Sequence, residues 1–387
     1  MRRLRVAYLP ASLRPGGAER QMLALAELLP QDRFKIEFVA IAGPGEYDAQ
    51  AEAAGARVRS LGRGANPDTS LPMKSAKRVS KILRYAALAR HARYDIVDAW
   101  LYPSDVLAAL ARPITGTPIV IAGRRNIDPQ DQFGRMEIGI GAAVRRLTDM
   151  VVANSAAVAA YAVAYQGIDP ARIRIIRNGV NVGQPATAVQ RDARRRELGV
   201  DDDEILIGCV ANYRDVKRLD RLIDAFAALA REGLPVRLEL IGEGPMRPDL
   251  EGQIRKAGLE SQICLHGSVP SAESLYAAFD VVVQSSEREG LPNALLEAGA
   301  AGRAIVATAA GGSSEIVVDG ETGLLVPVDD APALATAIRR VVTDIEIRGR
   351  LGAAARVHVT TSFGMDRFVA EFAELYETLA AQKHLRT

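Results

Sequence analysis

The sequence predicts an α/β protein made of two Rossmann-like domains, each built around a parallel sheet. Short apolar runs typical of buried strands alternate along the chain with stretches that have the periodicity of amphipathic helices. Glycine-rich turns follow several of the expected strands, as in nucleotide-binding folds. Between 181 and 190 the apolar periodicity is lost. We therefore expect one domain at 1–180, then a linker, and a second domain within 181–365.

The first half contains a regular alternation of expected strands and helices. Its first strand, at 4–9, leads through Gly16 and Gly17 into an amphipathic helix. Asn178-Gly179 is typical of a turn and closes the first domain. Further strands are expected at 36–41, 58–61, 96–99, 119–122 and 150–153, with helices at 49–54 and 104–111.

The second half repeats this alternation. A last helix, at 366–380, carries an apolar stripe from Phe368 to Leu379. The expected strands are at 205–210, 236–241, 263–267, 281–283, 305–307 and 323–327, with helices at 191–198, 219–231 and 331–342.

The stretch from Ser285 to Glu315 carries the strongest functional pattern. Pro292 lies where a helix is expected to begin, since its missing N–H has no cost there. Glu289 and Glu297 are eight residues apart, just over two turns, so a continuous helix would place both acids on one face. The N–H groups of Gly290 to Asn293 would be unpaired donors that suit a phosphate. One acid near each end of a diphosphate suggests a sugar nucleotide; the alternative is a plain strand–helix–strand unit with solvated glutamates.

This stretch resembles the E-x7-E signature of retaining glycosyltransferase family 4, whose members have the GT-B fold, two Rossmann-like domains facing a central cleft. The run from Glu289 to Glu297 is followed by Gly311-Gly312, as in the family. The resemblance covers essentially the whole chain and is strongest from Asn178 to Asp329. It implies that the helix at 366–380 packs back on the first domain.

The resemblance also implies a donor site, mainly in the second domain. Arg214 and Lys217 match an Arg and a Lys, three residues apart, that face the donor diphosphate in the family. Cations at a helix start oppose the helix dipole, so an anion is expected nearby. Glu289 would hold hydroxyls of the donor sugar, and Glu297 those of the ribose. The other expected donor-binding residues are Gly17, from a Gly-Gly-x-Glu element, and Gly290, Leu291, Pro292 and Asn293.

The same resemblance implies a reaction that retains the anomeric configuration and uses no metal. The leaving diphosphate would take the acceptor proton while Arg214 and Lys217 stabilise its growing charge. With Glu289 they form the expected catalytic set, and a role of Glu289 as nucleophile stays open. No Asp-x-Asp motif stands at a suitable place. We expect no cofactor, with the nucleotide diphosphate sugar as substrate, and domain closure would protect this donor from water.

The loop after the strand at 119–122 is the expected acceptor site. Many family members have a histidine there that contacts the donor sugar, but this chain reads Gly123-Arg124-Arg125-Asn126. Because guanidinium groups suit phosphate, Arg124, Arg125 and Asn126 are candidates for binding an acceptor phosphate. The alternative is that the two arginines are tied to nearby carboxylates.

The segment from Lys74 to Arg93 contains seven lysines and arginines and no acid, together with an apolar face. One interpretation is a surface helix packed on the sheet. The other is a helix whose basic side meets anionic lipid or a pyrophosphate-bearing lipid acceptor.

The composition excludes several classes of protein. The 49 basic and 47 acidic side chains nearly cancel, so nucleic acid is not an expected partner. No run approaches about 18 uncharged apolar residues, and the basic N-terminus reads as a first strand rather than a signal peptide. We expect a cytoplasmic protein, free or on the inner face of the cytoplasmic membrane.

Cys209 and Cys264 are expected to be buried free thiols, and their number and spacing exclude a zinc site.

We therefore expect a retaining glycosyltransferase that moves a hexosyl or N-acetylhexosaminyl group from a nucleotide sugar. The nucleotide is expected to be UDP or GDP. The acceptor is expected to be a glycan or a lipid-linked molecule in the synthesis of cell-envelope polysaccharide or glycoconjugates. Two alternatives remain. A GT-B sugar-nucleotide epimerase usually needs more carboxylates and a histidine in its cleft. A non-catalytic sugar-nucleotide-binding subunit of a polysaccharide assembly complex would not need the intact set of Arg214, Lys217, Glu289 and Glu297.

Overall fold

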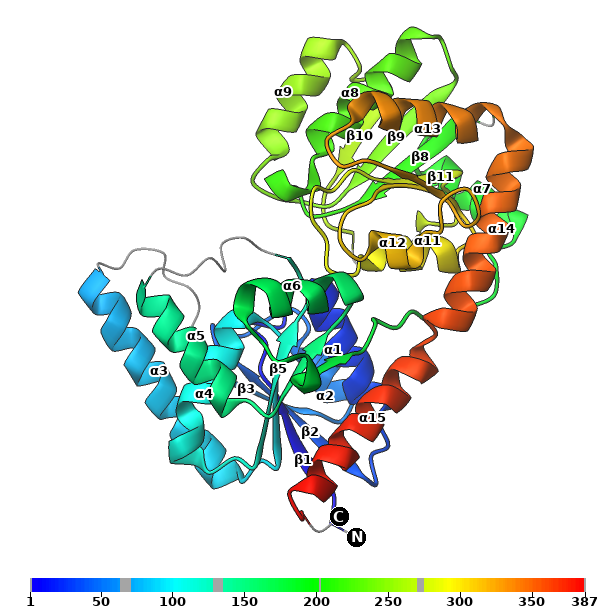
Figure 1. Cartoon of the computed structure of the whole chain (residues 1–387). Helices are drawn as coiled ribbons and strands as arrows, with labels where there is room; N and C mark the ends of the chain where they lie inside the picture. The colour runs from blue at the N-terminus through cyan, green and yellow to red at the C-terminus, as the bar shows by residue number, and fades with distance from the viewer. Residues whose placement is uncertain (1, 63–70, 128–134, 202, 270–274, 386–387) are drawn as a thin grey trace. The chain divides into compact units, whose positions relative to one another are not determined.

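The computed structural model describes residues 2–62, 71–127, 135–201, 203–269 and 275–385, and the chain divides into two compact units. The first consists of residues 1–178 and 366–387, and the second of residues 179–365. Each unit is an α/β domain with its own parallel sheet (Figure 1). The division lies two residues before the boundary expected from the sequence, and the C-terminal helix groups with the first unit.

The sheet of the first domain has seven parallel strands in the order β3-β2-β1-β4-β5-β6-β7. Its central strands are buried almost throughout, as is typical of a sheet covered on both faces. The strands are β1 (Leu4–Tyr8), β2 (Phe34–Ala40), β3 (Arg57–Ser60), β4 (Ile96–Ala99), β5 (Ile119–Arg124), β6 (Met150–Ala153) and β7 (Ile173–Ile175).

Helices connect these strands, and one of them, α5, lies in a stretch for which no helix was predicted. Ser155 caps α6, since its Oγ accepts a hydrogen bond from the Val158 N–H at 3.1 Å. The helices are α1 (Gly17–Leu28), α2 (Asp48–Ala53), α3 (Leu71–Ala92), α4 (Tyr102–Thr115), α5 (Arg135–Leu147), α6 (Ala156–Gln166) and the short 3₁₀ helix η2 (Pro170–Arg172).

The C-terminal helix α15 (Met365–Gln382) packs on the first domain through an aromatic cluster. The Phe372 ring stacks on Trp100, with centroids 5.6 Å apart and an interplanar angle of 12°. Tyr376 donates a hydrogen bond to Asp98 Oδ2 at 2.7 Å. All four side chains are fully buried. A helix far along the chain therefore completes the core of the first domain.

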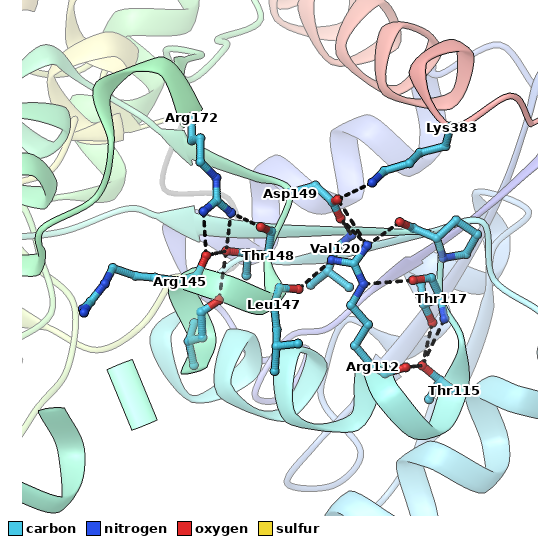
Figure 2. Close-up of polar contacts among 12 residues, drawn as sticks. Arg112, Thr115, Thr117, Val120, Arg145, Leu147, Thr148, Asp149, Arg172 and Lys383 are labelled. Carbon is cyan, nitrogen blue, oxygen red and sulfur yellow. Dashed lines mark hydrogen bonds and ion pairs between the residues drawn. The ribbon is translucent and has the colours of Figure 1, made fainter. Parts of the chain in front are cut away.

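A second anchor holds the end of this helix. Lys383 and Arg112 reach Asp149 from different segments, as Figure 2 shows, with Lys383 Nζ 2.8 Å from Oδ1 and Arg112 Nη2 2.9 Å from Oδ2. The Val120 N–H also donates to Oδ2, at 2.9 Å. Burial alone would raise the pKa of Asp149, but the bonds from Lys383, Val120 and Arg112 outweigh it, and its pKa is lowered.

Replacement of Asp149 by asparagine should destabilise the first domain by about 1–3 kcal/mol at neutral pH, because three donors lose a charged acceptor. The folded-state pKa of Asp149 lies below its unfolded value, so this stabilisation is complete at neutral pH and is lost as the pH falls below about 4. Urea denaturation at several pH values checks this. The exposed Asp32→Asn is the control, and a difference between wild type and Asp149→Asn that stays constant down to about pH 3.5 would contradict it.

The sheet of the second domain has six parallel strands in the order β10-β9-β8-β11-β12-β13. Buried side chains form a core on each of its two faces. The strands are β8 (Ile205–Val210), β9 (Val236–Ile241), β10 (Ile263–His266), β11 (Val281–Gln284), β12 (Ala304–Thr308) and β13 (Leu324–Val326).

Helix α14 (Ile345–Ser362) was not expected from the sequence, and it fixes the position of α11 (Asn293–Ala300). The two helices approach closely at Gly299, where an added Cβ would lie 2.6 Å from Val359 Cγ2. In the described part of the second domain, the other helices are α7 (Ala188–Glu197), η3 (Asp215–Lys217), α8 (Leu219–Arg231), α9 (Arg247–Ala257), α12 (Ser313–Ile316) and α13 (Ala331–Thr343). In the described ranges, no helix is both long and apolar enough to span a bilayer.

Candidate donor site

The order of strands in the second domain locates the candidate site. The chain order reverses between β8 and β11, so the loops that follow these neighbouring strands leave in opposite directions. In open parallel sheets, ligands bind at the carboxyl ends of strands at such a switch point. The two loops run from 211 to 218 and from 285 to 292. They contain Arg214, Lys217 and Glu289.

Lys217 and Glu289 meet at this switch point. Lys217 Nζ lies 2.6 Å from Glu289 Oε1. The same oxygen accepts from Gln284 Nε2 and from Ser286 Oγ, both at 2.6 Å. Glu289 is 9% exposed, and its two other donors are buried as well. The carboxylate is thus held in one orientation by three donors, and only Lys217 among them carries a charge.

Hydrogen bonds to two backbone carbonyls hold the two loops together. Ser285 Oγ donates to the Lys217 carbonyl at 2.9 Å, and the Glu287 N–H donates to the Val216 carbonyl at 2.9 Å. Arg214, just before η3, is exposed, and no described residue bonds its guanidinium group. This arrangement combines a neutralised ion pair with a nearby cation that is available for an anion.

Glu289 and Glu297 do not lie on one continuous helix, which is the arrangement that would have placed both acids on one face. Helix α11 begins at Asn293, with Pro292 as the N-cap residue, so Glu289 lies in the preceding loop and Glu297 lies in the helix. Helical spacing therefore does not relate the two acids. Glu297 is half-buried.

One backbone hydrogen bond fixes the loop before α11. The Gly290 carbonyl accepts from the Gly312 N–H at 3.0 Å, which ties the loop to the segment after β12. Leu291 and Asn293 each have an interaction partner, and Pro292 has no N–H. Pro292 therefore cannot be one of the donors that were predicted from Gly290 to Asn293. That the other N–H groups of this loop serve a phosphate stays a prediction.

In the first domain, Gly17 follows β1, an inner strand of the sheet. It is the first residue of α1 and is exposed. The chain order of this sheet reverses between β1 and β4, so the loop from Leu9 to Gly17 leaves from the switch point of the first domain. This places Gly17 where a ligand is expected in such a sheet.

Arg124 is part of a buried ion pair. It is 8% exposed. Its Nη1 lies 2.5 Å from Asp105 Oδ2, and its Nε donates to Gln166 Oε1 at 2.7 Å. The structure thus favours the alternative interpretation for Arg124, an arginine tied to a carboxylate, because an acceptor phosphate would have to compete with Asp105.

Arg125 is held by aromatic rings. Its guanidinium carbon lies 3.8 Å from the centroid of the Trp100 ring, and its Nη1 donates to Asn178 Oδ1 at 3.5 Å. Burial lowers the pKa of Arg125 to about 10, and burial raises the pKa of the nearby Asp98 to about 6. Asn126, two residues after the end of β5, is exposed. Of the three residues expected to bind acceptor, Asn126 is thus the most accessible.

The basic segment expected from Lys74 to Arg93 lies mostly in α3. Side chains from 71 to 79 lie outside the described residues. Tyr85, Ala86 and Ala89 are buried in a core cluster with β4 and α4 residues. Arg84 and Arg90 are exposed. The second half of the helix is therefore packed on the domain with its arginines in solvent.

Each of the two domains matches a known protein family. The family described as Glycosyltransferase Family 4 matches residues 15–184, and the family described as Glycosyl transferases group 1 matches residues 190–358. The chain belongs to glycosyltransferase family 4.

Two relatives of this family-4 chain show how much of its sequence is shared. D-inositol 3-phosphate glycosyltransferase from Streptomyces scabiei is 27% identical over 395 residues, which cover 96% of this chain and 88% of the relative. N-acetyl-alpha-D-glucosaminyl L-malate synthase from Bacillus anthracis is 28% identical over 182 residues, 47% of this chain and 48% of that protein.

The fold of this family member matches solved structures over nearly its whole length. Anabaena Alr3699/HepE, solved in complex with UDP and glucose, has a TM-score of 0.84 and 22% identity, and the match covers 97% of this chain and 100% of HepE. This similarity assigns the GT-B fold, two parallel-sheet domains of seven and six strands.

Two residues of the site were missed from the sequence. Gln284 and Ser286 both bind Glu289 Oε1. Gln284 ends a strand that is otherwise made of valines, and Ser286 begins the polar turn after it. The sequence pattern that could have identified these two residues is a polar side chain at the carboxyl end of a buried strand.

Proposed function

We propose that the protein transfers a sugar from a nucleotide diphosphate sugar to a glycan or lipid-linked acceptor and retains the anomeric configuration. The observation that carries this proposal is the ion pair between half-buried Lys217 and buried Glu289 at the switch point of the second domain, with the exposed Arg214 in the same loop as Lys217. A cation pair beside a fixed carboxylate suits a diphosphate joined to a sugar. Membership of glycosyltransferase family 4 supports the same assignment.

In the proposed reaction, the bond between the anomeric carbon and the diphosphate oxygen breaks. The acceptor oxygen bonds to that carbon on the same face, and its proton passes to the leaving diphosphate. Arg214 and Lys217 stabilise the charge that grows on this leaving group, as preorganised cations do in phosphate chemistry. Contact of Lys217 with the phosphate would weaken its ion pair with Glu289. The Glu289 carboxylate would then accept hydrogen bonds from sugar hydroxyls. No metal is required by this scheme.

The donor would lie along α11, with Glu297 accepting from the ribose hydroxyls. The backbone from Gly290 to Asn293 would lie beside the diphosphate. UDP-sugars are the first donors to test, because HepE, with the same fold, was solved with UDP and glucose. The transferred group is proposed to be a hexosyl or an N-acetylhexosaminyl group.

The acceptor is proposed to bind the first domain near Asn126, while Gly17 would let the backbone approach the donor phosphate. The exposed arginines of α3 support a location at the inner face of the cytoplasmic membrane, since they can contact anionic lipid headgroups. A role in cell-envelope polysaccharide or glycoconjugate synthesis would follow from a lipid-linked acceptor.

The donor is tested by thermal shift with UDP-, GDP-, ADP- and dTDP-sugars, without added metal. We expect a rise in Tm with sugars of one base, because a ligand that binds only the folded state stabilises it. The rise should be lost in Glu297→Ala and kept in Glu260→Ala, a variant of an exposed glutamate in the same domain.

Absence of any shift, or an equal shift in both variants, would contradict the proposed donor site. Turnover then separates the remaining functions. Transfer to an added acceptor supports the transferase. Binding without turnover would indicate a non-catalytic subunit, and release of free nucleotide with an epimerised sugar would indicate an epimerase.

A further inference from the structure

Three side chains with metal-ligating atoms lie together at the edge of the second sheet, on β9 and the edge strand β10. They are Glu239, Cys264 and His266, and one ligand atom from each lies within 4.8 Å of the other two. Cys264 is the direct partner of Glu239 in the parallel register, and His266 follows two residues later on the same face. The cluster is therefore built into the strand pairing.

The carboxylate of this cluster is fully buried and already oriented. Glu239 is 0% exposed. Its Oε1 accepts from Arg237 Nε at 2.8 Å, while its Oε2 contacts His266 Nε2. Arg237 is itself fixed, since its two terminal nitrogens donate to the carbonyls of Gly199 and Leu198 at 2.9 and 3.0 Å. Hydrogen bonds of this kind orient metal-ligating carboxylates in proteins.

The sulfur atom of Cys264 is held beside the carboxylate. Arg237, which bonds Glu239, also donates from Nη2 to Cys264 Sγ at 3.5 Å. Cys264 is half-buried rather than buried as expected. The His266 side chain is 33% exposed. A small ion can thus reach the cluster from solvent, and water can fill a fourth position.

The geometry needs only a small adjustment for zinc. Bonds from zinc to nitrogen, oxygen and sulfur are about 2.0–2.3 Å, so ligand atoms in a tetrahedral site lie about 3.3–3.8 Å apart. The largest separation here, within 4.8 Å, exceeds this by about one ångström. Rotation of the half-buried Cys264 and His266 side chains can supply that difference while Glu239 stays in place.

We propose that Glu239, Cys264 and His266 bind a zinc ion that clamps β10 to β9. The cluster lies on β9 and β10, whereas the proposed donor site lies at the ends of β8 and β11. Its effect would reach the loop that follows β9. The His266 carbonyl accepts from the Gly242 N–H at 3.3 Å and from the Tyr213 hydroxyl at 3.0 Å. The sequence excluded zinc from the number of cysteines, but a mixed ligand set needs only one.

Cobalt spectroscopy tests the site directly, since Co²⁺ bonded to a thiolate gives a charge-transfer band in the near ultraviolet. The full chain is first freed of metal with a chelator and then titrated with Co²⁺. Cys209 and Cys264 are the two cysteines of the chain, which provides a matched pair of variants. We expect the band in wild type and in Cys209→Ala, its loss in Cys264→Ala, and its bleaching by added Zn²⁺. His266→Ala should weaken Co²⁺ binding.

A second measurement does not depend on cobalt. Zn²⁺ should raise the Tm of metal-free wild type and of Cys209→Ala, and it should leave the Tm of Cys264→Ala unchanged. Circular dichroism checks that both variants fold. Wild type without a charge-transfer band, a band that persists in Cys264→Ala, or an equal Tm rise in the two cysteine variants would overturn the proposal. Sugar transfer is not part of either readout, so this result is independent of the proposed reaction.

Discussion

Replacement of Lys217 by alanine should lower kcat by about 10²–10³-fold, the effect of removing one preorganised group that stabilises transition-state charge. In the proposed reaction, Lys217 stabilises the leaving diphosphate. The variant also leaves Glu289 buried without its cationic partner. Release of nucleoside diphosphate, measured at saturating donor and acceptor, gives kcat directly.

The matched control is Lys256→Ala, an exposed lysine on α9 of the same domain, which should keep wild-type kcat. Because Lys217 and Glu289 are in contact, the losses in Lys217→Ala and Glu289→Gln should not add in the double variant. A kcat near wild type in Lys217→Ala, with the fold intact, would remove the main support for the proposed mechanism.

Replacement of Phe372 by alanine should destabilise the first domain by about 3–5 kcal/mol, as expected for a large cavity in a core. Phe372 is fully buried and contacts Trp100, Phe368 and Tyr376, with ring centroids 5.6, 5.1 and 5.7 Å away. The truncation therefore loosens the contact through which α15 completes the domain. Calorimetry should record a fall in the Tm of the first domain of about 2–4 °C per kcal/mol.

The control for this effect lies on the same helix. Glu374 is exposed and pairs with the exposed Arg174, so Glu374→Ala should change the Tm little. The transition of the second domain should not move in either variant, since residues 366–387 group with the first. A Tm of Phe372→Ala close to that of Glu374→Ala would mean that α15 contributes little to the stability of the first domain.

Much of the fold could be predicted from local patterns. Apolar runs such as 205–210 and 281–283 form strands because a sheet buried on both faces demands continuous hydrophobic side chains. Helix α14 could not be predicted in this way. Gly349 and Gly352 lower its helix propensity, and its stability comes from packing, where Val359 meets Gly299.

For the candidate site, too, local sequence patterns predicted some features and only the tertiary structure decided others. The sequence by itself determined the family and pointed to Arg214, Lys217, Glu289 and Glu297, because glycines and charges at a strand end form a local pattern. Only the tertiary structure decided that Lys217 pairs with Glu289, since their loops lie in different segments and meet only through the pairing of β8 with β11. It likewise placed Arg124 on Asp105 and gathered Glu239, Cys264 and His266. The physical reason is that sequence patterns report a residue's preference for a strand, helix or turn, whereas its partners are set by strand order and register.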